Sequence, residues 1–119
     1  MSQPPSAYLM KLLISALVAI AAVALSTASA RHTFTGVITD DMCAQTGHAA
    51  MRMGPTDAEC AIACAVSHGA AYVLREGKNV YTLSDQQTPE KFAGRRVRVA
   101  GTLDARTRTI QVDSITAAK

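Results

Sequence analysis

The chain has 119 residues, a formal net charge of +3 and only 4% aromatic residues. This length fits one small domain, and so slight a charge argues against a polyanionic partner such as nucleic acid. With few aromatic side chains, the core must be built mainly from Val, Ile, Leu and Ala. Such a core is marginally stable, and small secreted domains often add a disulfide bond or a metal ion.

The first thirty residues have the pattern of a secretory signal peptide. Lys11 precedes an apolar run over residues 12–25 that contains one polar residue, Ser15, and Ala28 and Ala30 are the small residues that a signal peptidase reads. The run is shorter than the roughly 18–20 residues of a membrane span. We therefore predict cleavage after Ala30, a secreted or periplasmic protein with no stable membrane anchor, and a single domain over residues 31–119.

Five short segments of this domain have the alternation and β-branched residues of strands. They are residues 33–39, 71–75, 79–83, 95–103 and 108–115. One helical turn is expected at Pro89, between the third and fourth strands. These elements predict an α+β, mainly β fold, a small five-stranded OB-like Greek-key barrel. A simple meander with a packed helix is the alternative.

Gly36 lies inside the first predicted strand, where it indicates a bulge or a sharp bend. The second and third strands form a hairpin that turns over residues 76–78. In the fourth strand, Val97, Val99, Gly101 and Leu103 alternate toward one face. In the last strand, Ile110 and Val112 are expected inward. Residues 117–119 are expected to fray.

Residues 42–69 form a Cys-rich loop and helix inserted between strands one and two. Residues 42–55 lack a clear period, so we expect a loop there. Thr56 and Glu59 form a Thr-x-x-Glu capping box, and Gly69 suits a helix C-terminus, so the helix is predicted over residues 57–68. Ile62 and Val66 would pack on the barrel, which would turn the cysteines toward the loop.

Two groups of proteins share segments with this chain. The C-terminal segments are Val80-Tyr-Thr-Leu-Ser-Asp85, Phe92-Ala-Gly94, Arg96-Val-Arg-Val-Ala-Gly-Thr-Leu-Asp104 and Thr109-Ile-Gln-Val-Asp-Ser-Ile115. This half resembles the bacterial OB-fold family of small periplasmic proteins. The whole domain resembles a group of small secreted bacterial proteins of unknown function, through Gly36-Val-Ile-Thr-Asp40, Met42-Cys43, Cys60, Cys64 and Gly77-Lys-Asn-Val-Tyr81. The resemblance implies the fold and the location, but no enzymatic activity.

A structural disulfide is the first interpretation of the three cysteines, because an exported protein meets an oxidising compartment. Cys60 and Cys64 lie one helical turn apart, which places their Cβ atoms about 5–6 Å from each other. A disulfide needs about 3.8 Å, so Cys43 would pair with Cys60 or Cys64. The insertion would then be a rigid lid on a non-enzymatic binding or envelope-protective domain, whose partner is a small ligand or an envelope protein.

A metal site is the second interpretation. Three thiolates and one imidazole complete a tetrahedral zinc shell, and we choose Cys43, Cys60, Cys64 and His48, with His68 as a substitute. Thioether ligands suit Cu(I), so Met51 and Met53 extend the prediction to copper, although packing is the better explanation of the methionines taken alone. The protein would then serve in metal storage, sensing or delivery.

The third interpretation is thiol-redox chemistry by the unpaired cysteine. Cys60 lies in the first turn of the helix, which lowers a thiol pKa, but Glu59 beside it opposes this. Other residues are weaker candidates: His32 near the new N-terminus could bind Cu(II), and Asp40-Asp41 could bind calcium but suit a turn. The arginines near the last hairpin have no aromatic residues among them, so a solvated face is expected there.

Overall fold

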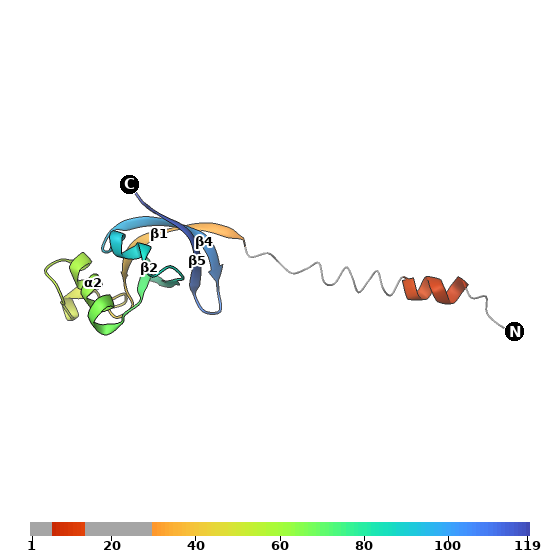
Figure 1. The fold of residues 1–119 in the computed structure, drawn as a ribbon, viewed down its shortest axis with the longest axis horizontal. Helices are drawn as coiled ribbons and strands as arrows, with labels where there is room; N and C mark the ends of the chain where they lie inside the picture. Colours follow the sequence, from red (N-terminus) through yellow and green to blue (C-terminus); the bar gives the residue numbers. More distant parts are fainter. Residues whose placement is uncertain (1–5, 14–29) are drawn as a thin grey trace.

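The computed structural model describes residues 6–13 and 30–119 (Figure 1). Residues 6–13 form a short helix. Residues 14–29 lie outside the described residues, and they include residues 14–25 of the predicted apolar run and Ala28. Nowhere in the described ranges is there a helix with both the length and the hydropathy to cross a membrane.

Residues 30–119 form a five-stranded mixed sheet that closes into a ring (Figure 1). The strands are β1 (Arg31–Asp40), β2 (Tyr72–Glu76), β3 (Asn79–Leu83), β4 (Arg96–Asp104) and β5 (Thr109–Ala117). Their order is β1-β2-β3-β5-β4, and β4 pairs with β1 to complete the ring. The mainly β class is confirmed. The simple meander is wrong, because β5 lies between β3 and β4 and runs parallel to β3.

The first strand closes the ring because it pairs with two neighbours. Its first part pairs with β4 and its last part with β2, and Val37 is opposite both Arg75 and Arg96. A Cβ atom on Gly36 would lie 2.4 Å from the carbonyl oxygen of Arg75. Gly36 therefore permits close approach of β2. The sheet's register irregularity lies elsewhere, between Ala100 and Gly101 of β4.

The strand ends differ slightly from prediction. The hairpin turn comprises only Gly77 and Lys78, with Gly77 at φ 58°, because Glu76 still pairs in β2. Residues 117–119 are not wholly frayed, since β5 continues to Ala117 and the amide of Ala118 donates to the carbonyl of Arg96 at 3.0 Å. The 3-10 helix η2 (Thr88–Phe92) confirms the helical turn at Pro89.

The core lies inside the ring and under the inserted helix. Its buried members are Ile38, Ala61, Tyr72, Leu74, Leu83, Ala93, Val97, Val99 and Ile110. Of the inward residues that strand alternation predicts, Val97, Val99 and Ile110 are fully buried, whereas Leu103 and Val112 are partly buried against the core. The core is mostly aliphatic, as the composition requires.

The inserted helix α2 (Asp57–His68) has the predicted bounds and lies between β1 and β2. The Thr56 side chain accepts a hydrogen bond from the amide of Glu59, and Gly69 ends the helix at φ 66°. The stripe that packs on the core consists of Ala58, Ala61, Ile62 and Ala65. The prediction that Val66 packs on the barrel is wrong. The Val66 side chain is 74% exposed, because helical spacing places it on a different face of α2 from the residues that pack on the core.

Candidate metal centre

All three cysteine side chains are buried in one cluster, separate from the core, where α2 meets the preceding loop (Figure 1). Cys43 is 3% exposed and comes from the turn after β1, while Cys60 and Cys64 are 0% exposed and come from successive turns of α2. The helix was expected to turn its thiols toward the loop, and it does.

The loop closes directly over Cys60. The amide of Met53 donates to Cys60 Sγ at 3.2 Å, and Cys60 Sγ donates to the carbonyl of Met51 at 3.4 Å. Gly54 lies so close that an added Cβ would meet Glu59 Cβ at 2.9 Å. The backbone of this loop is therefore part of the wall of the cluster.

Asp40, the last residue of β1, sets the direction of the chain that carries Cys43. Its Oδ1 accepts hydrogen bonds from the amides of Met42 and Cys43, both at 3.0 Å. Its Oδ2 has no hydrogen-bond partner, although the side chain is 0% exposed. An unpaired carboxylate oxygen in the interior is costly, so Oδ2 needs a cation or a proton donor.

His48 returns to the cluster through a tight turn. Gly47 has φ 76°, and its amide donates to the carbonyl of Cys43 at 2.8 Å, so the chain folds back before η1 (His48–Ala50) begins. His48 Nε2 lies 3.1 Å from Thr39 Oγ1, within hydrogen-bond distance. The second ring nitrogen, Nδ1, is buried without a partner and lies 3.8 Å from Asp40 Oδ2.

Two overlapping groups in the described part of the chain have the spacing of metal ligands. In one, ligand atoms of Cys43, His48 and Cys60 all lie within 4.8 Å of one another. In the other, the same holds for Asp40, Cys43 and Cys64. Cys43 belongs to both groups. The two groups together include the four residues chosen from the sequence and add Asp40, but neither group holds all four.

The surroundings favour the protonated thiol at Cys43 and Cys64. Burial first, then the Asp40 carboxylate and the other two cysteines, together raise the pKa of Cys43 from 9.0 to about 12. Burial, followed by Asp40, also raises the pKa of Cys64. A bound metal ion would offset both causes, because its positive charge favours thiolate over thiol. A cysteine that reacts as a thiolate would need a lowered thiol pKa instead.

The remaining predicted ligands lie outside these groups. His68 is exposed at the end of α2, and His32 is exposed on β1. Met51 and Met53 place their backbones at Cys60, but their side chains are exposed. The three cysteines are free in this structure, which therefore does not show the predicted bond from Cys43 to Cys60 or Cys64.

Sequence reasoning missed two features. Asp40 was interpreted as a turn residue, which it is, but its second oxygen also faces the cluster. Its position three residues before Cys43 was the available signal. The second feature is that two arginines lie near aromatic rings. Arg95, just before β4, lies 5.7 Å from the ring centroid of Phe92 in η2, and Arg108, just before β5, lies 5.4 Å from that of Tyr81 in β3.

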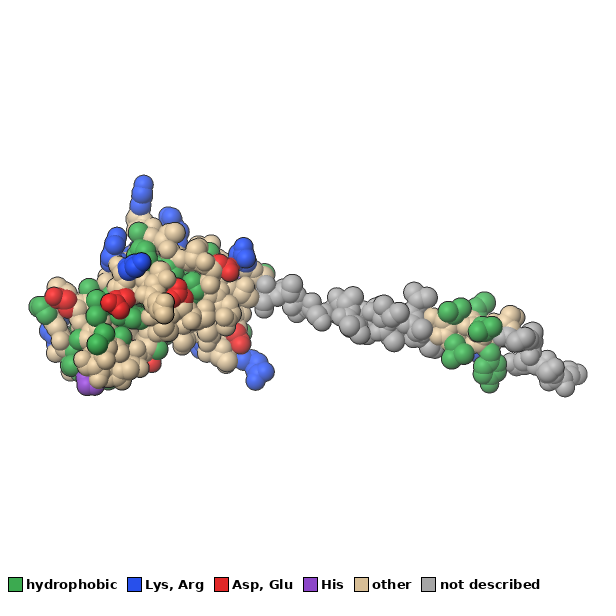
Figure 2. All heavy atoms as spheres, viewed as in Figure 1, with side chains coloured by type: hydrophobic (Ala, Val, Ile, Leu, Met, Phe, Trp, Pro, Cys, Tyr) green, Lys and Arg blue, Asp and Glu red, His purple; other side chains and the backbone are tan. Residues whose placement is uncertain are grey.

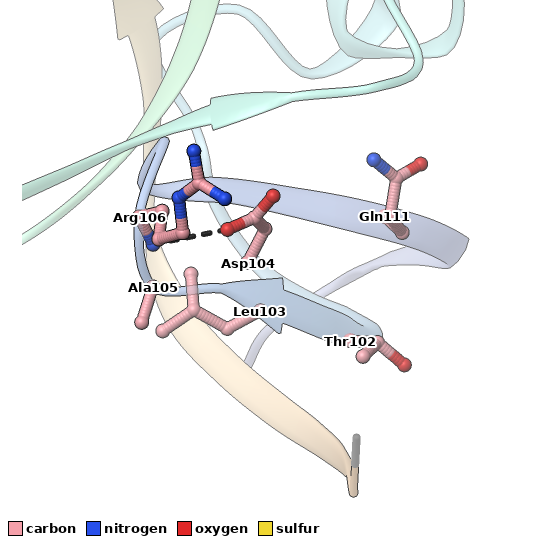
Figure 3. A pocket seen from close by; sticks show the side chains of 6 residues that line it. All are labelled: Thr102, Leu103, Asp104, Ala105, Arg106 and Gln111. Carbon is pink, nitrogen blue, oxygen red and sulfur yellow. Dashed lines mark hydrogen bonds between the residues drawn. The ribbon is translucent and has the colours of Figure 1, made fainter. Parts of the chain in front are cut away.

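The surface hollows are separate from the thiols. Figure 3 shows one of about 400 Å³ at the turn between β4 and β5, where Asp104 accepts a hydrogen bond from the amide of Arg106. A second, of about 320 Å³, lies beside the end of α2 and is lined in part by Tyr72, Gln86 and Glu90. Neither of these two hollows is lined by a cysteine.

Comparison with known proteins places the thiol cluster outside the recognisable part of the chain. No curated protein and no solved structure matches the sequence. Residues 66–118 match a protein family described as "Protein of unknown function (DUF5818)". This span holds strands β2 to β5 and the last residues of α2, but none of Cys43, His48, Cys60 and Cys64. The chain is therefore similar to this family over its C-terminal strands.

Proposed function

We propose that this protein is an exported, non-enzymatic metal-binding protein whose centre is formed by Cys43, His48, Cys60 and Cys64. The observation that carries the proposal is the convergence of these side chains in a buried cluster beside an unpartnered imidazole nitrogen. Cysteine and histidine are the residues that bind zinc and copper in proteins, and three sulfurs with one nitrogen suit a tetrahedral ion.

The surroundings of His48 support its role as a ligand. Ligating histidines use the other ring nitrogen for a hydrogen bond that fixes the orientation of the ring. Here Thr39 Oγ1 lies next to Nε2, which leaves Nδ1 available on the side of Asp40. Asp40 would hold the Cys43 turn and place a negative charge near the ion.

Four protein ligands complete a tetrahedral shell and leave no position for a substrate. Such a centre suits storage, sensing or delivery of the metal more than catalysis. It would also join the loop after β1 to α2, so that metal binding adds to the stability of the folded state. Zn(II) and Cu(I) both fit the donor set.

The fold and location belong to the same proposal. The order β1-β2-β3-β5-β4, closed through β1 and β4, supports an OB-type barrel with α2 as an insertion. The pattern of residues 1–30 supports export.

A structural disulfide from Cys43 to Cys60 or Cys64 is the second candidate. It is favoured by the mutual proximity of the thiols, since Cys43 interacts with both Cys60 and Cys64. In an oxidising compartment, close thiols form a bond unless a metal holds them. The protein would then be a binding or envelope-protective domain without a metal.

The experiment is an intact-mass measurement of the protein purified from the periplasm without chelator, first under native and then under denaturing conditions with thiol alkylation. We expect one metal ion per chain under native conditions and three alkylated thiols after denaturation. Cys43→Ser and His48→Ala should lose metal, while His68→Ala is the control and should keep it. A mass lower by two hydrogen atoms, one alkylated thiol and no metal would replace the metal centre with the disulfide.

A further inference from the structure

We propose that the ion carried by this centre is Cu(I), and that Met42, Met51 and Met53 form its entry route. This inference rests on the proposed metal centre and names its cargo. The three residues are called the methionine rim below.

The distribution of methionine is the first observation. Within residues 31–119, every methionine belongs to the rim. Methionine usually fills irregular gaps in protein cores. Here Met42, Met51 and Met53 are 43%, 48% and 40% exposed, and Val66 is the only other exposed large hydrophobic residue described in that range. Packing therefore does not account for these side chains.

The position of the rim is the second observation. Met42 immediately precedes Cys43, and its amide is held by Asp40. Met51 and Met53 each contact Cys60 Sγ through the backbone. Figure 2 shows hydrophobic side chains at the surface at the end of the domain where α2 and this loop lie. Each rim residue is thus linked to a buried thiol ligand, Met42 through the chain and Met51 and Met53 through backbone contacts.

The ligand types of the methionine rim and of the buried centre favour Cu(I) over Zn(II). Neutral thioethers are soft ligands that bind Cu(I), whereas zinc sites use thiolate, imidazole and carboxylate. A neutral thioether binds Cu(I) more weakly than a thiolate does, so an ion that reaches the rim is driven inward. Each thiol that binds the ion releases its proton to water, and copper remains Cu(I) throughout. No oxidant or reductant is consumed.

Two buried atoms without hydrogen-bond partners lie where this route ends. His48 Nδ1 and Asp40 Oδ2 are both buried without partners beside the thiols. A cation that leaves the rim for the thiols gives both atoms a favourable electrostatic partner. The rim is accessible, and the centre is not, because its three cysteines are at most 3% exposed.

The test is the rate of Cu(I) transfer from its bicinchoninate complex to the reduced protein, followed by loss of the complex's colour without oxygen. The variant replaces all three rim residues, Met42→Leu, Met51→Leu and Met53→Leu, which keeps size and hydrophobicity but removes sulfur. We expect transfer to slow by about tenfold or more, a typical effect of residues that support a metal site, with final Cu(I) content unchanged. Val66→Leu is the control and should transfer at the wild-type rate.

Each outcome decides between the two proposals. Equal rates in the rim variant and the wild type would overturn the rim as the entry route and leave the centre intact. Binding of Zn(II) but not Cu(I) by the reduced protein would overturn the whole inference and leave the proposed function standing. If the reduced protein binds neither ion, the metal centre itself fails.

Discussion

Asp40 Oδ2 and His48 Nδ1 lie 3.8 Å apart inside the protein, and neither atom has a hydrogen-bond partner. The two atoms lie within ion-pair distance of each other, and the contact is a salt bridge when the His48 ring is protonated. When the ring is neutral, neither atom has a buried partner, and a cation beside the three thiols would supply one. The other oxygen of Asp40 and the other nitrogen of His48 both have partners from the chain. The side chains are therefore held in place with one atom each left free.

Asp40→Asn should lower the pKa of Cys43 and Cys64. The Asp40 carboxylate disfavours a second negative charge nearby and is a cause of the raised pKa of both thiols. The asparagine oxygen can still accept from the amides of Met42 and Cys43, so the turn should persist. Thiolate absorbance of the metal-free protein as a function of pH is the measurement. Asp41→Asn, an exposed neighbour, is the control, and an identical titration in both variants would count against the Asp40 effect.

The metal-free, reduced protein should lose stability as pH rises from about 9 toward about 12. The Cys43 thiol has an ordinary pKa of 9.0 and a folded-state pKa of about 12, so the unfolded chain releases its proton first. Proton release from the unfolded state favours unfolding within that window, and below pH 9 the Cys43 contribution is constant.

Urea denaturation at pH values across this window tests whether the free energy of unfolding falls as pH rises. Cys43→Ala should show a shallower loss of unfolding free energy with pH than the wild type. A wild-type curve that is flat or rises over the window would contradict the burial effect. Saturating metal should weaken the dependence, because the bound thiols no longer carry protons.

Gly36→Ala should destabilise the sheet by about 1–3 kcal/mol, the usual range for forced overpacking. The added Cβ would lie 2.4 Å from a backbone oxygen of Arg75, which cannot move aside without disturbing the β1–β2 pairing. Chemical denaturation gives the free energy, and hydrogen exchange of β2 amides locates the damage. Gly69→Ala is the comparison, because an added Cβ there has nothing within 4 Å and any cost comes from φ 66°. Equal β2 exchange in both variants would argue against the close approach.

Local signals predicted the local elements well. The capping residues Thr56 and Gly69 act on neighbouring backbone groups, and α2 begins and ends where they indicate. Alternation of Val97 and Val99 predicted the buried face of β4 in the same way. Val66 was predicted on the wrong face of α2. The face that a helix buries depends on the elements that the helix packs against, and those elements are distant in the sequence.

The sequence by itself determined the helix, the existence of the strands and the four candidate ligands, since each depends on residue type and short-range spacing. Only the tertiary structure decided that β5 pairs with β3, that Asp40 keeps one oxygen free, and that Cys43 meets Cys60 and Cys64. These relationships join residues far apart in the chain. They depend on how the ring closes and on which groups burial deprives of water, and neither is encoded in a local pattern.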